Sequence, residues 1–343
     1  MVSQPGHDGK RRSRYSGFMS AWPVTIADVL QARKRIRELL PRTPLRRYAP
    51  LDEVVGYGIR VFVKHENHQP TQAFKARSAL AALTALPDAE KKRGVVGATR
   101  GNHGAGLAWA GQLLRIPVAV CVPLGNNPEK NEAMRGYGAE LIEEGDDYDA
   151  AVQVAERLVR ERGMTLVHST NNRHVIAGAG TMALEMIEQQ PTLDAMVLSV
   201  GGGSQAVGAL AVARAMRPGL QIFGVQAERA SAIHDSWHAG KASSGAGCNT
   251  FADGLATRVP PEMTFEALRE GLSGFVKVSE AGLAEAVRLM IRTTHNLAEG
   301  AGAAGLAGLL ELRDNLAGKS VGICLSGGNI DAETLRRVLS REI

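Results

Sequence analysis

Short apolar segments alternate with helical lengths along most of this chain, and this alternation restricts the fold more than any other feature. The apolar segments, predicted to be buried strands, are Val95–Ala98, Val118–Val122, Ala139–Ile142, Thr165–Val167, Ala195–Val200, Gln221–Val225 and Ser320–Leu325. Helices are predicted between them at Gly101–Leu114, Lys130–Tyr137, Tyr148–Arg162 and Gln205–Met216. Short apolar strands separated by helices indicate parallel βαβ units with helices on both faces of the sheet. We therefore predict an α/β fold.

The composition excludes several classes of protein. With 343 residues, 44% of them hydrophobic, the chain can bury the core of one large or two ordinary domains. No apolar run is long enough for a membrane-spanning helix. The net charge of +5 comes partly from residues 1–21, which we predict to be a disordered basic tail, and no other basic motif suggests nucleic-acid binding. The tail lacks the apolar stretch of a secretory signal, so we expect a cytoplasmic protein.

Two smaller features complete this general description. An amphipathic helix is predicted from the N-cap Thr25 to about Leu40. Three scattered cysteines do not form a disulfide framework or a zinc site. Cys121 and Cys324 lie in apolar strands, so we expect both to be buried, unreactive thiols.

Lys75 lies between a predicted strand, Ile59–Val63, and a predicted helix, Ser78–Leu86. A lysine amine is mostly protonated at pH 7, so as a nucleophile it needs a lowered pKa or must capture a carbonyl as a Schiff base. Pyridoxal phosphate supplies such a carbonyl. Taken alone, however, a lysine in a loop is more often a solvated surface charge.

Gly201, Gly202 and Gly203 follow a predicted strand and precede a predicted helix. Glycines let the backbone approach an anion closely, and the amides at the start of a helix point toward it. The stretch is a candidate phosphate cradle, to which Ser204 could add a hydroxyl donor. From these residues alone, a flexible turn explains the glycines equally well.

Four stretches in this order resemble one known family. They are Glu66–Ser78, Thr99–Gly104, Gly201–Ser204 and Leu325–Asp331. From about Arg42 to about Asp331 the chain is similar to pyridoxal-phosphate enzymes of fold type II, the tryptophan synthase β-like group, and especially to threonine and serine dehydratases and serine racemase. The resemblance implies two open parallel-sheet α/β domains with the active site in the cleft between them. Residues 22–93 and 170–343 would form a large cofactor-binding domain, and residues 94–169 a small mobile domain.

The resemblance also implies a role for each matching residue. Lys75 would hold pyridoxal 5′-phosphate as a Schiff base, with Phe74 beside the ring and Asn102 hydrogen-bonded to the ring hydroxyl. Ser326 would face the ring nitrogen, and a hydroxyl there leaves the ring a milder electron sink than a carboxylate would. The cofactor phosphate would be held by Gly201, Gly202, Gly203 and Ser204. The substrate carboxylate would be held by Thr99, Arg100, Gly101, Asn102 and His103. Glu299 would lie near the ring, and Asp253 would be structural.

The activity implied is that of an ammonia-lyase, or dehydratase, that eliminates the β-hydroxyl of a small amino acid. Lys75 would remove the Cα proton, and the products would be a 2-oxo acid and ammonia. The substrate would be like threonine or serine, with 3-hydroxyaspartate or another substituted serine still open. The alternatives are β-replacement, as in threonine synthase, amino-acid racemisation, and a non-catalytic binding protein. Relatives are commonly dimers or tetramers, so we expect a homo-oligomer.

Three positions depart from the family pattern or stay open. Arg100 stands where relatives carry a small residue, Ser or Asp. It cannot act as a base, so we expect racemisation to be poor, and if it points inward its guanidinium could bind a second substrate carboxylate. His103 could be a metal ligand or an acid/base, or simply a structural histidine of its turn. Glu228 and the Ala232 carbonyl occupy plausible positions for Mg²⁺ or Ca²⁺, but His234 replaces an expected acidic ligand.

Overall fold

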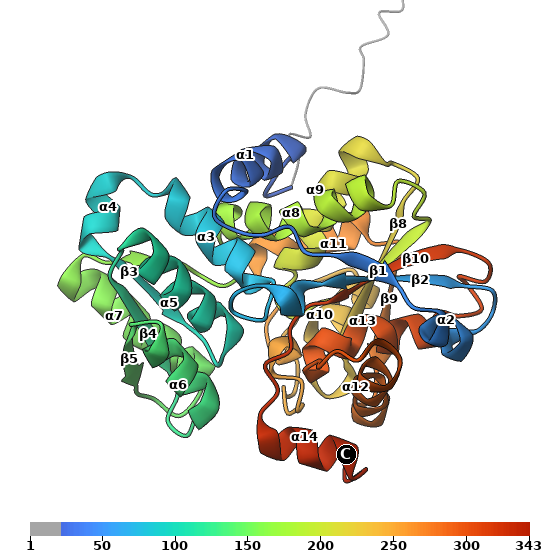
Figure 1. Cartoon of the computed structure of the whole chain (residues 1–343). Coiled ribbons are helices and arrows are strands. Elements are labelled where there is room, and N and C mark those ends of the chain that lie inside the picture. Colours follow the sequence, from blue (N-terminus) through green and yellow to red (C-terminus); the bar gives the residue numbers. More distant parts are fainter. Residues whose placement is uncertain (1–21) are drawn as a thin grey trace, which may run out of the picture.

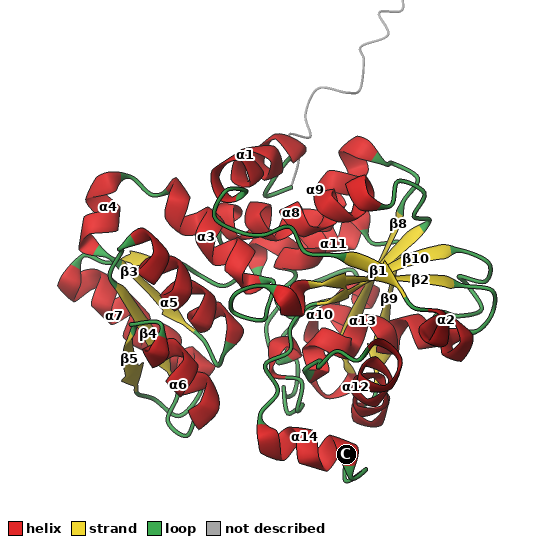
Figure 2. Ribbon diagram, viewed as in Figure 1, coloured by secondary structure: helices red, strands yellow, loops and turns green. Residues whose placement is uncertain are grey.

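Two separate sheets, each flanked by helices, form the protein (Figures 1 and 2). The computed structural model describes residues 22–343, so the predicted tail over residues 1–21 lies outside the described residues. The larger sheet has the order β1-β2-β10-β7-β8-β9, and the smaller sheet the order β5-β4-β3-β6. All neighbouring strands are parallel except β1, which runs antiparallel to β2.

The strands and helices have the following bounds. The larger sheet consists of β1 Leu45–Arg47, β2 Arg60–His65, β7 Ala195–Ser199, β8 Gln221–Ala227, β9 Gly274–Val278 and β10 Ser320–Leu325. The smaller sheet consists of β3 Val95–Ala98, β4 Val118–Val122, β5 Glu140–Glu143 and β6 Thr165–Leu166. The helices are α1 Ile26–Ile36, α2 Ala49–Val55, α3 Lys75–Ala85, α4 Asp88–Arg93, α5 Asn102–Leu114, α6 Pro128–Gly136, α7 Tyr148–Arg162, α8 Arg173–Gln189, α9 Ser204–Met216, α10 Ala232–Ala239, α11 Glu262–Gly271, α12 Glu280–Thr294, α13 Gly300–Glu311 and α14 Ala332–Leu339, with short 3-10 turns at Glu66–His68, Glu228–Ala230 and Asp253–Leu255.

Strand β7 shows why the central strands of the larger sheet are mainly apolar. Successive side chains of a strand point to opposite faces of the sheet. Met196 and Leu198 enter the core on one face, and Ala195 and Val197 enter the core on the other. Helix α9 contacts β7 and β8, and α13 contacts β7 to β10. Because both faces are covered, both sets of alternate positions in β7 are mainly apolar.

The predicted strands are confirmed to within about two residues, and the α/β class with them. Strands β1 and β9 were not predicted. The N-cap is confirmed, because Thr25 and Asp28 hydrogen-bond each other's backbone amides. The prediction that this helix continues to Leu40 is wrong, since α1 ends at Ile36 and the chain turns there.

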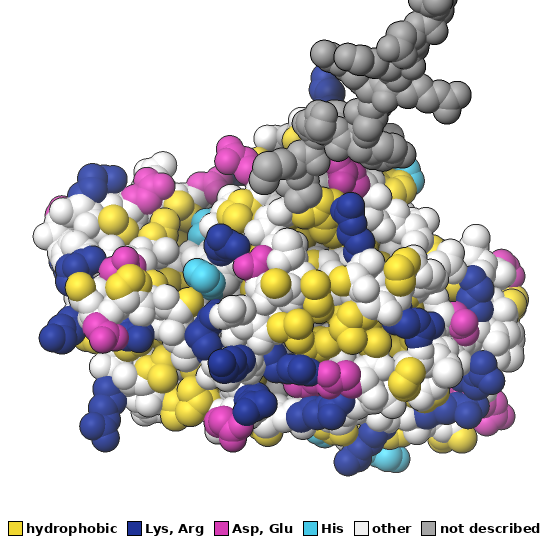
Figure 3. Space-filling model, turned by 90° about the horizontal axis from the view of Figure 1, so that it is seen from above, with side chains coloured by type: hydrophobic (Ala, Val, Ile, Leu, Met, Phe, Trp, Pro, Cys, Tyr) yellow, Lys and Arg dark blue, Asp and Glu magenta, His cyan; other side chains and the backbone are white. Residues whose placement is uncertain are grey.

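Several general expectations can be compared with the structure. Cys121 and Cys324 are buried, and burial raises the pKa of the Cys121 thiol to about 11, as expected of unreactive thiols. No helix within residues 22–343 is long and apolar enough to cross a membrane. On the face shown in Figure 3, lysine and arginine side chains are interspersed with aspartate and glutamate.

Candidate active site

The segments that follow the parallel strands β2, β3, β6, β7 and β10 meet around a cavity of about 730 Å³. Carboxyl ends of parallel strands lie at the same edge of a sheet, where α/β proteins bind ligands. Residues of both sheets line the cavity, among them Lys75, Thr99 to His103, His168 to Asn171, Gly201 to Gln205, and Ser326. The structure therefore brings the predicted cofactor and substrate residues together.

Lys75 is the first residue of α3 and lies inside this cavity. Its Nζ donates a hydrogen bond to the Ser169 carbonyl at 3.0 Å and lies 3.4 Å from Ser204 Oγ. Burial lowers the pKa of the Lys75 amine to about 8. The Lys75 amine thus loses its proton more readily than a solvated lysine does, so a solvated surface charge is not the explanation for it. Phe74 precedes it, with the ring centroid 4.9 Å from Nζ.

The glycine turn between β7 and α9 is too crowded for side chains. A Cβ on Gly202 would lie 2.1 Å from Thr170 Oγ1, and one on Gly201 would lie 2.1 Å from the Gly254 carbonyl oxygen. Gly203 has a φ of 93°, which favours glycine. The turn leads directly into the first amides of α9, so it can hold an anion at the cavity wall.

Asn102, the first residue of α5, is held from two sides. Its Nδ2 donates to Glu299 Oε1 at 2.6 Å, and its Oδ1 accepts from Asn329 Nδ2 at 2.8 Å. Glu299 is buried, and burial raises the pKa of its carboxyl. Glu299 was expected near the cofactor ring, and it does line the cavity beside Asn102.

Lys130 and Asp253 form an ion pair at the edge of the cavity, with Nζ and Oδ2 2.6 Å apart. Burial alone would lower the pKa of Lys130, but the neighbouring carboxylates of Glu299 and Asp253 raise it. Lys130 comes from the smaller sheet's α6, and Asp253 from a 3-10 turn that precedes α11.

Thr99 and His103 belong to the turn after β3 and to the start of α5, and each forms a hydrogen bond with the backbone. Thr99 Oγ1 accepts a hydrogen bond from the Gly101 amide at 3.0 Å. His103 lies 2.8 Å from the Val167 carbonyl oxygen through Nε2, which therefore carries the ring proton. Burial, together with the nearby Lys75, lowers the pKa of His103 to about 3. A histidine that stays neutral and bonds to the backbone fits the structural interpretation.

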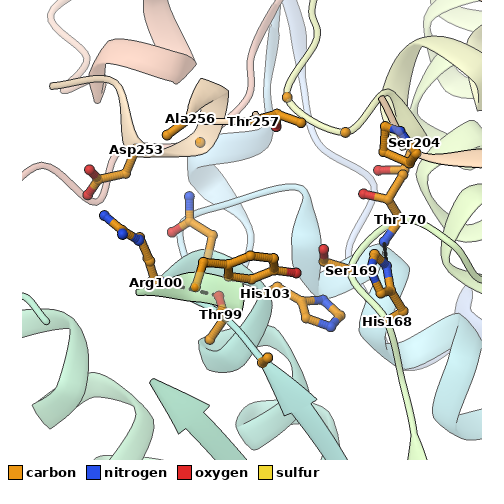
Figure 4. A pocket seen from close by; sticks show the side chains of 18 of the residues that line it. Thr99, Arg100, His103, His168, Ser169, Thr170, Ser204, Asp253, Ala256 and Thr257 are labelled. Atoms are coloured by element: carbon orange, nitrogen blue, oxygen red, sulfur yellow. Dashed lines mark hydrogen bonds between the residues drawn. The ribbon is translucent and has the colours of Figure 1, made fainter. Parts of the chain in front are cut away.

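Arg100 lines the cavity and is exposed to it, and Figure 4 shows its side chain pointing toward Asp253. Within residues 22–343 it forms no ion pair at 4 Å or less, whereas Lys130 pairs with Asp253 and Arg258 with Asp149. Ser326 is buried, and its hydroxyl donates to the Ala301 carbonyl at 3.2 Å.

His168 lines the cavity but was not predicted as a site residue. Its Nδ1 accepts a hydrogen bond from the Thr170 amide at 3.0 Å (Figure 4). It accepts a second one from the Asn171 amide at 2.8 Å. A doubly used Nδ1 places the ring proton on Nε2 and keeps the ring neutral. The signal for His168 was its position directly after a predicted strand, at the edge where the other site residues lie.

The predicted metal residues are not assembled into an evident site. Glu228 is exposed, Ala232 is buried at the start of α10, and Asp235 contacts both His234 and Lys277. In the part of the chain that the structure describes, no three His, Cys, Asp or Glu side chains are placed to share a metal ion.

The comparison with known proteins agrees with this geometry. Residues 36–327 match the family model of pyridoxal-phosphate dependent enzymes. An L-threonine ammonia-lyase of Thermotoga maritima is 36% identical over 318 residues, which cover 93% of this chain and 79% of that protein. A catabolic L-threonine dehydratase of Staphylococcus aureus is 32% identical and covers 94% of both chains. The solved structure of maize serine racemase superposes with a TM-score of 0.88 at 30% identity, covering 94% of this chain and 98% of that one. The chain therefore belongs to the pyridoxal-phosphate dependent enzymes, in their fold type II group.

Proposed function

We propose that this protein is an ammonia-lyase that eliminates the β-hydroxyl of a small amino acid, giving a 2-oxo acid and ammonia. The observation that carries the proposal is the buried Lys75 amine with a pKa of about 8, placed between the glycine turn and the turn after β3. The names of the two similar proteins, a threonine ammonia-lyase and a threonine dehydratase, support the same reaction class.

The residues present fit the cofactor. Gly201, Gly202 and Gly203 leave no room for side chains and turn the first amides of α9 toward the cavity, which suits a phosphate. Lys75 reaches the same space, since its Nζ lies 3.4 Å from Ser204 Oγ. Asn102 and Ser326 would then meet the ring, as their positions in the cavity wall allow.

When bound, pyridoxal phosphate supplies an aldehyde that holds the substrate amine and a ring that withdraws electrons from Cα. Lys75 Nζ would take the Cα proton, because it is the buried amine whose pKa lies near the working pH. Until then the Ser169 carbonyl orients it. The amides at the start of α5 and the Thr99 hydroxyl would bind the substrate carboxylate.

Racemisation requires a second group that can return a proton to the opposite face of Cα. Arg100 occupies the turn where relatives carry such a group, and a guanidinium stays protonated at neutral pH, so it cannot act as a base. We therefore expect elimination to exceed racemisation.

The visible spectrum of the purified protein tests the proposal. Serine, threonine, 3-hydroxyaspartate and phenylserine are added in turn, and release of a 2-oxo acid is assayed in the same sample. A cofactor band that is lost in Lys75→Ala, together with 2-oxo acid from one substrate, is the expected result. A band that responds to amino acids without 2-oxo acid release would contradict the lyase and favour β-replacement or racemisation.

Two further expectations concern the assembly and the metal. By family likeness we expect a homo-oligomer, and sedimentation velocity showing only monomers would contradict this.

We expect a chelator titration to leave turnover unchanged, because Asp235 already contacts Lys277 and His234. Turnover that falls with chelator and returns with Mg²⁺ or Ca²⁺ would show that a cation is required.

A further inference from the structure

We propose that Asn329 is a positioning residue that fixes the orientation of the Asn102 amide, so that Asn102 turns a hydrogen-bond donor toward the main cavity. The inference rests on the proposed function in one respect: the ligand group opposite Asn102 is taken to be an oxygen of the cofactor ring. Nothing in the sequence motif around Asn329 indicates this role.

The backbone carbonyl of Thr71 determines the direction of the hydrogen bonds. A carbonyl oxygen only accepts, so the end of the Asn329 amide that lies 2.9 Å from it must be Nδ2. The same Nδ2 lies 2.8 Å from Asn102, so that atom of Asn102 must be an acceptor, Oδ1. The other end of Asn102 is therefore Nδ2, which donates to Glu299 Oε1 at 2.6 Å.

The two ends of the Asn102 amide face different spaces. Asn329 lines a second, neighbouring cavity of about 490 Å³ and is absent from the walls of the main one. Glu299 lines both cavities. Oδ1 is thus turned away from the main cavity, and Nδ2 is turned toward it. One N–H of Nδ2 is used by Glu299, and one is left for a ligand.

The Thr71 carbonyl that binds Asn329 belongs to the segment that leads into Lys75, and backbone hydrogen bonds tie this segment to the Asn329 loop. The Gly328 amide donates to the Gln72 carbonyl at 2.9 Å, and the Phe74 amide donates to the Ser326 carbonyl at 2.9 Å. Thr71 O is therefore fixed relative to Asn329 by the same backbone that places Lys75. The loop before α3 positions both the amine and, through Asn329, the Asn102 amide.

Glu299 is constrained as well. Its backbone amide donates to the Gly327 carbonyl at 3.1 Å, and a Cβ on Gly327 would lie 2.4 Å from Glu299 Oε1. Glu299 Oε1 thus accepts one N–H of Asn102 Nδ2. The other N–H is free to donate to an acceptor, such as an oxygen of a bound ligand. On the cofactor, that oxygen would be the deprotonated ring hydroxyl.

The test measures cofactor binding and its spectrum in addition to activity. Asn329→Ala removes the donor, and Asn329→Asp keeps the shape but cannot donate. We expect both to raise the dissociation constant for pyridoxal phosphate about tenfold, the loss typical of one hydrogen bond, and to shift the absorption maximum of the bound cofactor. Asn126→Ala is the matched control, because Asn126 donates to Asn131 at 2.6 Å on the wall of the second cavity.

A double-mutant cycle separates positioning from a general structural effect. If Asn329 acts through Asn102, then Asn329→Ala has no further effect on the dissociation constant or the spectrum once Asn102→Ala is present. Additive effects, or an Asn329→Asp protein with wild-type affinity and spectrum, would overturn the proposal. A wild-type protein that binds pyridoxal phosphate without lyase turnover would count against the proposed function and leave this inference standing.

Discussion

Lys75 carries an amine in surroundings that disfavour its charge. Its pKa is lowered from 10.5 to about 8 by burial, so the folded state holds the proton less tightly than the unfolded state does. Below pH 8 both states are protonated and burial costs stability, on the order of 3 kcal/mol as an upper limit. Between pH 8 and 10.5 the folded protein releases the proton first, and the cost disappears.

The first prediction concerns the apoprotein. Lys75→Met removes the buried charge at similar volume, so we expect it to unfold at higher urea concentration than wild type at pH 7. The gain should be about 1 to 3 kcal/mol at pH 7 and should fall to about a quarter of that at pH 10, because the wild-type amine is then neutral in the folded state and partly neutral in the unfolded state. Urea titrations at both pH values measure it. A gain that is equal at pH 7 and pH 10 would mean that the amine charge is not its source.

Arg100 is the second residue with a specific consequence. It faces the cavity without an ion pair in the described chain, so its guanidinium is available to a second substrate carboxylate. We predict that Arg100→Ala lowers kcat/KM for 3-hydroxyaspartate at least tenfold more than for threonine. Arg100→Lys should retain part of the difference, because it keeps the charge but not the paired donors. Equal losses on both substrates would contradict selection by charge.

At the scale of elements, the junction of β7 with α9 depends on glycine for a steric reason. We predict that Gly202→Ala weakens pyridoxal phosphate binding by at least tenfold, because its Cβ would meet Thr170 Oγ1 and displace the turn. Gly219→Ala is the control, since nothing lies within 4 Å of its Cβ. Cofactor titration followed by absorbance compares the two. If Gly202→Ala binds as tightly as Gly219→Ala, the turn is not the phosphate site.

At the scale of the whole molecule, two ion pairs cross the cavity between the parts that carry the two sheets. Lys130 of α6 pairs with Asp253, and Asp149 of α7 pairs with Arg258. All four residues line the cavity. We expect the two pairs to help hold these parts together over a substrate, and salt should weaken the more exposed Asp149–Arg258 pair.

The corresponding prediction uses the Lys130 pair. Asp253→Asn should raise KM about two- to fivefold with a smaller change in kcat, because a weakened pair closes the cavity less often. Glu140→Gln is the control, since Glu140 of the edge strand β5 pairs with Arg162 at 2.7 Å and neither residue lines a cavity described above. Steady-state kinetics at two salt concentrations measure both variants. A KM that does not change in Asp253→Asn would exclude this role.

The order of strands and helices could be predicted because its cause is local. A strand buried on both faces is mainly apolar, so β3, β4, β7 and β10 were visible as runs of apolar residues. Strand β1 was missed because it is three residues long, mostly exposed and antiparallel. The glycine turn and Lys75 were visible because each is tied to a fixed place between a strand and a helix.

Only the tertiary structure decided how those residues work together. The pKa of Lys75 depends on burial that several distant elements supply, and the Asn102 amide is oriented by residues 197 and 227 positions away. His168 became a site residue only when β6 was placed beside β3. The sequence by itself determined the α/β class and the family, because patterning and motif order are local. The charge states of the site residues, the directions of their hydrogen bonds and the direction of the Arg100 side chain depend on long-range contacts, which only the folded chain creates.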